Sequence, residues 1–417
     1  MLREGVDFQA RPFEADNRSA IHGSVVDRLT EPPRAIRATP FVWRDPSSIP
    51  PREWLYGRHY ARKFISTTLA PGGLGKSSLV LVEALAMITG RPLLGVPSAG
   101  SARVWIWNGE DPRDEIERRI AASCLHYGIQ PHEIADRLFI DSGRETEIIV
   151  AHQARDRTAV AQPVVEALLA TIRENGIDCV FIDPFVSSHE VSENDNNAIN
   201  RVAKTWARIA DQTNCAVELV HHTRKIASGE TITIADGRGA VALIDASRSA
   251  RVLNPMSEQE AANLGVENRR LHFRVDNGKA SMSAPPPTNK ASWFKMASID
   301  LRNGPSGAGD SVGVVANWTP PDLLEEFTLG DLDKVQCAIH GENCRDDSQA
   351  NEWVGKLIAE VLNIDLEKPA GKAKVKALQR FWIASKALAV VERKDRKGND
   401  RKYIEVGEWA REKSPTP

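Results

Sequence analysis

A glycine-rich loop near the front of the chain contains the residues with the clearest chemistry. In the run Ala70-Pro-Gly-Gly-Leu-Gly75-Lys76-Ser77, three glycines come before a lysine and a serine. Backbone N–H groups of such a loop can converge on phosphate oxygens, the lysine can reach the β- and γ-phosphates of ATP, and the serine hydroxyl can ligate Mg²⁺. One position departs from the pattern, because an alanine replaces the first glycine. The predicted nucleotide contacts are Ala70, Gly72, Gly73, Gly75, Lys76, Ser77 and Ser78.

Two acidic segments further along the chain fit the same chemistry. The apolar run from Ile177 ends in Asp183, as a strand does when its last carboxylate holds Mg²⁺ through water. An earlier apolar run, Arg103 to Trp107, is followed by Glu110 and Asp111. We expect Glu110 to be the general base that activates the attacking water, with Asp111 as its competitor. The alternative is that both carboxylates only cap the next helix.

Polar residues follow the next two predicted elements as well. A strand from Cys215 ends at His222, where a polar side chain could sense the γ-phosphate. A histidine pair at such a place is otherwise a hydrogen-bonded structural feature, and no third ligand at zinc spacing accompanies it. Arg238 lies in a glycine-flanked turn and is the predicted arginine finger for a neighbouring subunit's ATP. The alternative is that Arg238 is an ordinary surface arginine at the start of a helix. Further candidate cations are Arg248, Arg251 and Lys279.

The elements that position these residues alternate regularly. From about Phe64 to Ile244, apolar strands alternate with helices, which predicts a doubly wound, mainly parallel α/β sheet of the P-loop NTPase kind. Strands at Arg270–Val275, Trp293–Ile299 and Val314–Trp318 add antiparallel neighbours at its end. Before the loop, residues 1–40 read as a flexible leader. The aromatic segment 41–57 should pack against the core or a neighbouring subunit.

Composition narrows the class of protein. The chain has 417 residues, 41% of them hydrophobic, and a formal net charge of −2. This charge gives no global sign of nucleic-acid binding, so any such sign must be local. Five cysteines suggest reduced thiols rather than a disulfide framework. No signal peptide or membrane span is evident, and we expect a cytoplasmic protein that does not bind membranes.

The end of the chain is locally basic. Between Lys368 and Lys402, twelve Lys or Arg accompany three Asp or Glu, a density that suits phosphate contacts. Amphipathic helices followed by a hairpin around Gly398 resemble a winged helix-turn-helix, an α+β domain. A protein-docking winged helix is the competing interpretation. The predicted contacts to DNA are Lys376, Arg380, Lys386, Arg393, Lys394, Arg396 and Lys397.

The predicted domains follow from these segments. They are a leader at 1–40, the ATPase domain at 41–325, a linker at 326–348, the winged-helix-like domain at 349–410 and a disordered tail at 411–417. Cys337, His340 and Cys344 lie in the expected linker, but their spacing makes no complete tetrahedral zinc set.

The order of the motifs is more informative than any single motif. APGGLGKSS, NGEDP, VFIDP, VELVHHTRK and GRGAVALIDASRSARV follow one another, and together they resemble the RecA-like ATPases of the plasmid replicative helicase RepA family. The resemblance implies a homo-hexameric ring with ATP between subunits. It also implies Lys76 and Ser77 for phosphate and Mg²⁺, Glu110 as base, Asp183 for Mg²⁺, His222 as γ-phosphate sensor and Arg238 as finger.

Two functional hypotheses follow from this resemblance and the basic tail. The first is a ring-forming, DNA-dependent ATPase that translocates along or unwinds single- or double-stranded DNA. It would serve replication of a plasmid, phage or mobile element, with proteins of that process as partners. The second is an ATP-switched DNA-binding regulator or loader without motor activity. A weaker third option is an ATPase whose C-terminal module docks a protein.

Overall fold

The computed structural model describes residues 37–154, 157–223, 231–237, 241–282, 291–395 and 397–410. It divides into two compact units, 1–51 and 52–417. The described part of the first unit holds one short 3₁₀ helix, η1 (Pro46–Ser48), whose N-terminus is capped by the Asp45 side chain. Phe41 and Trp43 are 85% and 75% exposed there.

The second unit is built around a nine-stranded sheet in the order β13-β12-β11-β10-β3-β9-β8-β4-β5. The strands from β10 to β5 in this order run parallel, and β11, β12 and β13 are antiparallel additions. This arrangement confirms the predicted fold class. The strands are β3 (Ile65–Ala70), β4 (Val104–Asn108), β5 (Leu138–Ser142), β8 (Cys179–Asp183), β9 (Ala216–His222), β10 (Ser249–Pro255), β11 (His272–Ala280), β12 (Ser292–Asp300) and β13 (Ser311–Asn317).

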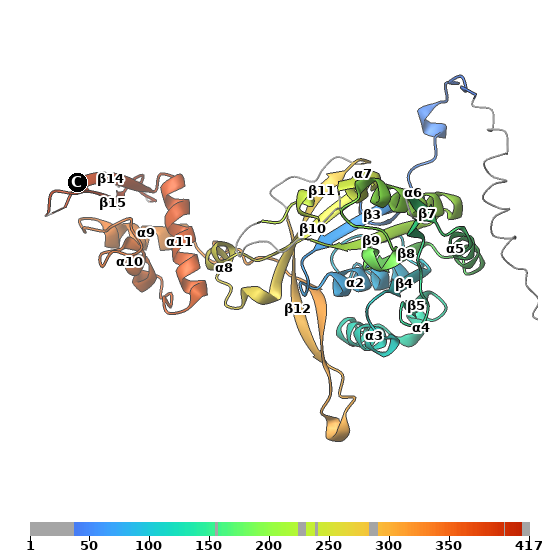
Figure 1. Cartoon of the computed structure of the whole chain (residues 1–417). Helices are drawn as coiled ribbons and strands as arrows, with labels where there is room; N and C mark the ends of the chain where they lie inside the picture. Colours follow the sequence, from blue (N-terminus) through green and yellow to red (C-terminus); the bar gives the residue numbers. More distant parts are fainter. Residues whose placement is uncertain are drawn as a thin grey trace, which may run out of the picture. The chain divides into compact units, whose positions relative to one another are not determined.

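Helices cover both faces of this sheet (Figure 1). They are α2 (Lys76–Thr89), α3 (Arg113–Tyr127), α4 (Pro131–Ile134), α5 (Gln162–Glu174), α6 (Asn196–Thr213) and α7 (Val241–Ala246). The short helix α8 (Glu258–Leu264) lies away from the sheet and packs against α11 (Pro369–Ala384) (Figure 1). Alternate residues of a strand point to opposite faces. In β8, Val180 and Ile182 accordingly pack with α5 and α6, whereas Cys179 and Phe181 pack with α2. Strand β8 is therefore apolar on both faces, as its hydrophobic run predicts. The neighbouring strands β3 and β9 are also buried, but they include polar residues such as Thr67 and Glu218.

Several short elements have no counterpart in the sequence prediction. Two small hairpins are formed by β1 (Trp54–Tyr56) with β2 (Tyr60–Ala61) and by β6 (Ala151–Ala154) with β7 (Arg157–Val160). The 3₁₀ helices η2 (Phe185–Ser188), η3 (Ile234–Asp236), η4 (Arg269–Leu271) and η5 (Pro305–Gly307) occupy loops. The first hairpin buries Tyr56 and Tyr60, so these aromatic side chains belong to the core of the second unit.

The C-terminal part has its own hydrophobic cluster. It consists of α9 (Leu329–Ile339), α10 (Val354–Val361), α11 (Pro369–Ala384) and the hairpin of β14 (Leu388–Lys394) with β15 (Asp400–Val406). Leu332 and Val335 of α9 pack in the same cluster as Trp382 and Ile404. The stretch expected to be a linker thus contains a helix that shares this core. Among the described residues, no helix combines the length and apolarity that crossing a membrane requires.

Candidate nucleotide-binding site

Neighbouring parallel strands end together at one edge of the sheet, and the predicted chemical residues lie at these ends. Ala70, the last residue of β3, is in register with His222 at the end of β9. Asp183 at the end of β8 is in register with Asn108 at the end of β4. Glu110 follows β4 by two residues. The fold therefore brings the glycine loop, both acidic segments and the histidine to a single edge.

The loop from Pro71 to Gly75 connects β3 to the N-terminus of α2. Gly73 and Gly75 have φ angles of +78° and +94°, a region that L side chains rarely adopt. A Cβ on Gly75 would also lie 2.8 Å from the Met296 sulfur. Gly72 has neither constraint, since its φ is not positive and the space around a Cβ is open. The backbone thus requires glycine at two of the three positions, next to the buried Lys76.

Asp183 and Ser77 provide the oxygen atoms suited to Mg²⁺. The Asp183 side chain is buried, and this burial raises the pKa of its carboxyl group, while the Lys76 ammonium and the Ser77 hydroxyl lower it. Hard oxygen donors beside a phosphate-binding loop are what Mg²⁺ prefers. A buried carboxylate with a lysine next to it therefore fits the predicted metal position.

Glu110 and Asp111 have different surroundings. The Asn108 side-chain oxygen accepts from the backbone N–H groups of Glu110 at 2.9 Å and Asp111 at 2.7 Å, which fixes the turn. The Asp111 carboxylate pairs with the Arg119 guanidinium at 2.7 Å. The Glu110 side chain is 56% exposed, and His222 Nε2 lies 3.8 Å from its Oε1 atom. Glu110 is the more exposed of the two carboxylates, and its contact with His222 is longer than the Asp111–Arg119 ion pair, so Glu110 stays the predicted base.

His222 lies between the start of the phosphate loop at Ala70 and the Glu110 carboxylate. Burial is the main cause that lowers the pKa of its imidazole, and the Lys76 charge lowers it further, while Glu110 raises it. The net effect favours the neutral ring. A neutral imidazole has a single N–H donor, so it can donate to a phosphate oxygen or to the Glu110 carboxylate, but not to both at once.

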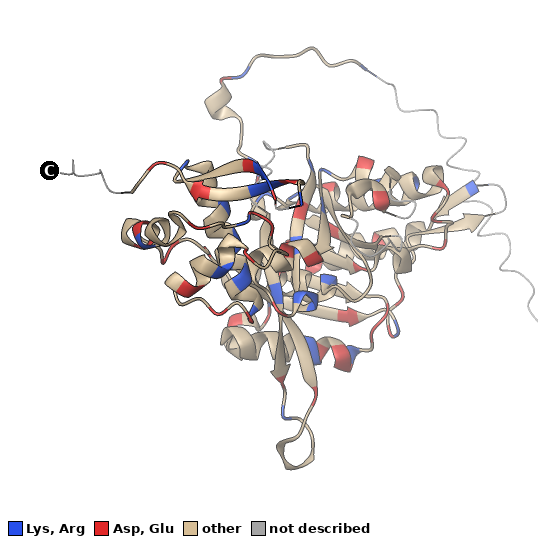
Figure 2. Ribbon diagram, turned by 90° about the vertical axis from the view of Figure 1, so that its left-hand side faces the viewer, with Lys and Arg blue, Asp and Glu red and all other residues tan. Residues whose placement is uncertain are grey.

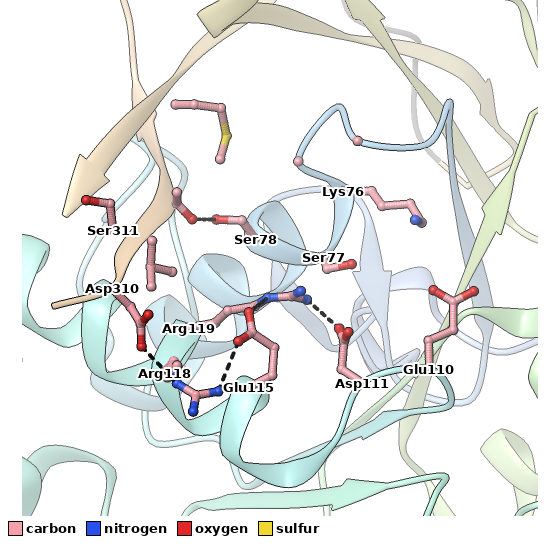
Figure 3. A pocket seen from close by; sticks show the side chains of 15 residues that line it. Lys76, Ser77, Ser78, Glu110, Asp111, Glu115, Arg118, Arg119, Asp310 and Ser311 are labelled. Atoms are coloured by element: carbon pink, nitrogen blue, oxygen red, sulfur yellow. Dashed lines mark hydrogen bonds and ion pairs between the residues drawn. The ribbon is translucent and has the colours of Figure 1, made fainter. Parts of the chain in front are cut away.

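A cavity of about 760 Å³ extends from the phosphate loop across α3 to β13 (Figure 3). Its lining residues are Gly73, Gly75, Lys76, Ser77, Ser78, Glu110, Asp111, Glu115, Arg118, Arg119, Met296, Asp310, Ser311, Val312 and Gly313. The volume lies within the range of small-ligand pockets. The α3 and β13 residues were not predicted from the sequence. Arg118 is held there by Asp114, Glu115 and Asp310.

Ser78 differs from the other predicted nucleotide contacts. It lines the cavity, but its hydroxyl donates to the Gly313 carbonyl oxygen at 3.3 Å and accepts from the Val315 N–H at 3.0 Å. These bonds tie α2 to the antiparallel end of the sheet. The hydroxyl therefore has a structural use that the sequence pattern did not indicate.

The cations considered for action on a neighbour's ATP fall into three groups. Arg238 lies outside the described residues. Arg251 is buried and binds the Glu83 carboxylate at 2.6 and 2.7 Å, so it cannot reach another subunit. Lys279 donates to the backbone oxygens of residues 244 and 245 at 2.8 and 3.0 Å. Arg248 is exposed and remains available.

The predicted DNA contacts of the C-terminal part are largely on its surface. Lys376, Arg380, Lys386, Lys394 and Lys397 are exposed, and Lys and Arg colour both strands of the β14–β15 hairpin in Figure 2. Arg393 is exposed too, but it pairs with Glu405 across the hairpin. Arg396 lies outside the described residues.

Comparison with known proteins gives two findings. Residues 30–228 match the family model of the AAA domain, a stretch that includes the phosphate loop, Glu110, Asp183 and His222. The crystal structure of the RadB recombinase is similar to 57% of this chain and 89% of that chain, with 14% sequence identity and a TM-score of 0.38.

Proposed function

We propose that the whole chain, whose residues 30–228 match the family model of the AAA domain, is a ring-forming, DNA-dependent ATPase. In this proposal it is a helicase or translocase of the RepA kind, acting in replication of a plasmid, phage or mobile element. One observation supports the hydrolytic part most strongly. The exposed Glu110 carboxylate and its neighbour His222 lie at the same sheet edge as Lys76 and Asp183.

In the proposed mechanism each side chain has one task. Lys76 neutralises charge on the β- and γ-phosphate oxygens, and Glu110 orients and deprotonates the water that attacks in line. The single N–H of neutral His222 would donate to a γ-phosphate oxygen when ATP is bound and to Glu110 when it is not, so that the γ-phosphate releases the Glu110 carboxylate. Mg²⁺, held by Ser77 and through water by Asp183, would neutralise further phosphate charge.

In the proposed ring, a second protomer adds a cation to the site. The Glu110 side chain is more than half exposed, which leaves space for a cation from a second protomer. Arg238 is the residue we propose for this task, and an arginine supplied in trans is a recurring device in such sites. The expected assembly is a homo-hexamer, with one ATP at each contact between protomers.

DNA binding is assigned to the C-terminal part, which we propose to be a winged-helix domain. Three helices and a two-stranded hairpin are the elements of such a domain, and the exposed cations on α11 and the hairpin suit phosphate contacts. Neutralising Lys376, Lys394 and Lys397 together should weaken DNA binding and reduce its salt dependence. Unchanged binding would favour protein docking instead.

A strand-displacement assay separates the motor from an ATP-switched regulator. Only a motor separates a partial duplex in an ATP-dependent way, whereas both bind DNA. Sedimentation with ATP and single-stranded DNA gives the assembly in the same buffer. A hexamer that displaces the strand supports the proposal, and a monomer or dimer without displacement contradicts it.

A further inference from the structure

Helix α6 carries a basic stripe on its exposed side. Arg201, Lys204 and Arg208 are all exposed and lie three and four residues apart, so they share one face of the helix. At a rise of about 1.5 Å per residue, the stripe extends about 10 Å along the axis. With the residues that the structure describes, none of the three forms an ion pair. Their charges are therefore available to a partner.

The stripe borders a hollow of about 580 Å³. The hollow is lined by Val160 of β7 and by Asn197, Asn200, Arg201, Lys204, Thr205 and Arg208 of α6. The lining contains no carboxylate and no aromatic side chain. It offers hydrogen-bond donors along one line, with positive charge at three points.

The opposite side of α6 fixes this stripe in place. Val202, Trp206 and Ile209 are fully buried in the core cluster. The Trp206 indole N–H also donates to the Ser188 hydroxyl at 3.3 Å. A helix anchored in this way holds the backbone that carries the three cations in place. Binding therefore does not have to order this backbone, which lowers its entropy cost.

We propose that the α6 stripe binds the sugar-phosphate backbone of a nucleic-acid strand. Arginine, lysine and asparagine are typical donors to phosphate oxygens, whereas the Thr205 hydroxyl already donates to the Arg201 backbone oxygen at 3.0 Å. A strand in a duplex has about one phosphate per 3.4 Å, so the stripe matches about three phosphates. An acidic protein partner fits less well, because the centre of a protein interface is depleted of charged residues and enriched in aromatic ones. Binding at this site should not depend on base sequence, because contacts to phosphate and sugar carry no sequence information directly.

This site extends the proposed DNA-dependent function and lies on the ATPase domain, apart from the C-terminal cations. Its test measures binding without ATP, so it does not depend on hydrolysis. The full-length chain is titrated against fluorescein-labelled dT20 by anisotropy from 0.05 to 1 M salt. The variant is Arg201→Gln/Lys204→Gln/Arg208→Gln. A matched control, Arg270→Gln/Lys295→Gln/Arg302→Gln, removes three exposed charges from the antiparallel end of the sheet.

The logarithm of the binding constant falls as the logarithm of the salt concentration rises, and loss of three phosphate contacts should make this slope less negative by about 2. Binding should weaken about 100-fold at 0.1 M salt. The control variant should bind like the wild type, and thermal melts should show that all proteins are folded. A benzoylphenylalanine at position 204 should crosslink to dT20.

If the salt dependence of binding has the same slope for the α6 variant and the wild type, the inference is overturned. This holds even if neutralising Lys376, Lys394 and Lys397 weakens binding. The proposed DNA-dependent function would then survive without this site. Absence of any dT20 binding by the wild type would refute both. Preferential α6-dependent binding of polyglutamate over dT20 would assign the stripe to an acidic protein and also overturn the inference.

Discussion

Replacing Glu110 by glutamine should reduce ATP turnover by about 10² to 10⁴-fold, the usual contribution of a general base. The amide retains the shape and hydrogen bonding of the side chain but cannot accept the water's proton. The Glu110 side chain makes no buried contact that folding needs, since it is 56% exposed. We therefore expect unchanged stability and nearly unchanged ATP affinity.

Asp111 provides the matched comparison. Asp111→Asn breaks an ion pair with Arg119 in which the two side chains are 27% and 29% exposed. A partly solvated pair of this kind contributes about 0 to 1 kcal/mol. Turnover should therefore fall by no more than about fivefold.

Phosphate release at saturating ATP, with and without single-stranded DNA, measures both variants. Binding of a fluorescent ATP analogue shows whether any loss lies in binding or in the chemical step. The reasoning is refuted if Asp111→Asn loses 100-fold or more while Glu110→Gln keeps most of the wild-type rate. That result would make Asp111 the base and Arg119 its positioning residue.

Three further perturbations follow from the structure. Arg251→Met leaves the Glu83 carboxylate buried beside Tyr60 without its guanidinium partner. The free energy of unfolding in urea should fall by about 3–5 kcal/mol. Adding Glu83→Leu should restore most of this stability, and an equal loss in the single and double variants would contradict the expectation. Burial lowers the pKa of His189 to about 4, so below pH 6.5 the unfolded state takes up the proton first. Stability should then fall by about 3 kcal/mol between pH 6.5 and 4, and in unfolding titrations His189→Gln should flatten this fall. Gly75→Ala should abolish binding of a fluorescent ATP analogue while Gly72→Ala keeps it, because among the three loop glycines only Gly75 combines a positive φ with a close neighbour.

Local patterns predicted the phosphate loop and the central sheet well. Strand β8 is an apolar run that ends in Asp183, strand β9 is a largely apolar buried strand that ends at His222, and the buried strand β3 leads directly into the glycine loop. In a parallel sheet those ends meet at one edge. The meeting of Lys76, Asp183 and His222 was therefore readable before any coordinates were known.

Long-range contacts were not readable in the same way. Arg118 and Arg119 stand in the charged run RDEIERR of α3, which is typical of a solvated helix face. Their place in the cavity depends on β13, which is distant in sequence and brings Asp310 beside Arg118. Arg251 looked like a mobile cation because its partner, Glu83, lies in the middle of an apolar helix.

The C-terminal part shows a second limit. Leu332, Val335 and Ile339 have helical spacing, yet this stretch is bounded by glycines and contains Cys337 and His340, which favoured a linker. The structure uses the apolar spacing to pack α9 into the C-terminal cluster. Packing partners more than 40 residues away in sequence, such as Trp382 and Ile404, decide the outcome.

ATP hydrolysis by the wild type and by Lys76→Ala, each with and without single-stranded DNA, tests the central claim most directly. We expect hydrolysis by the wild type that DNA stimulates, and none above background by Lys76→Ala, although that variant melts like the wild type. Turnover retained by Lys76→Ala, or wild-type hydrolysis that no polynucleotide changes, would contradict a DNA-dependent ATPase built on this loop.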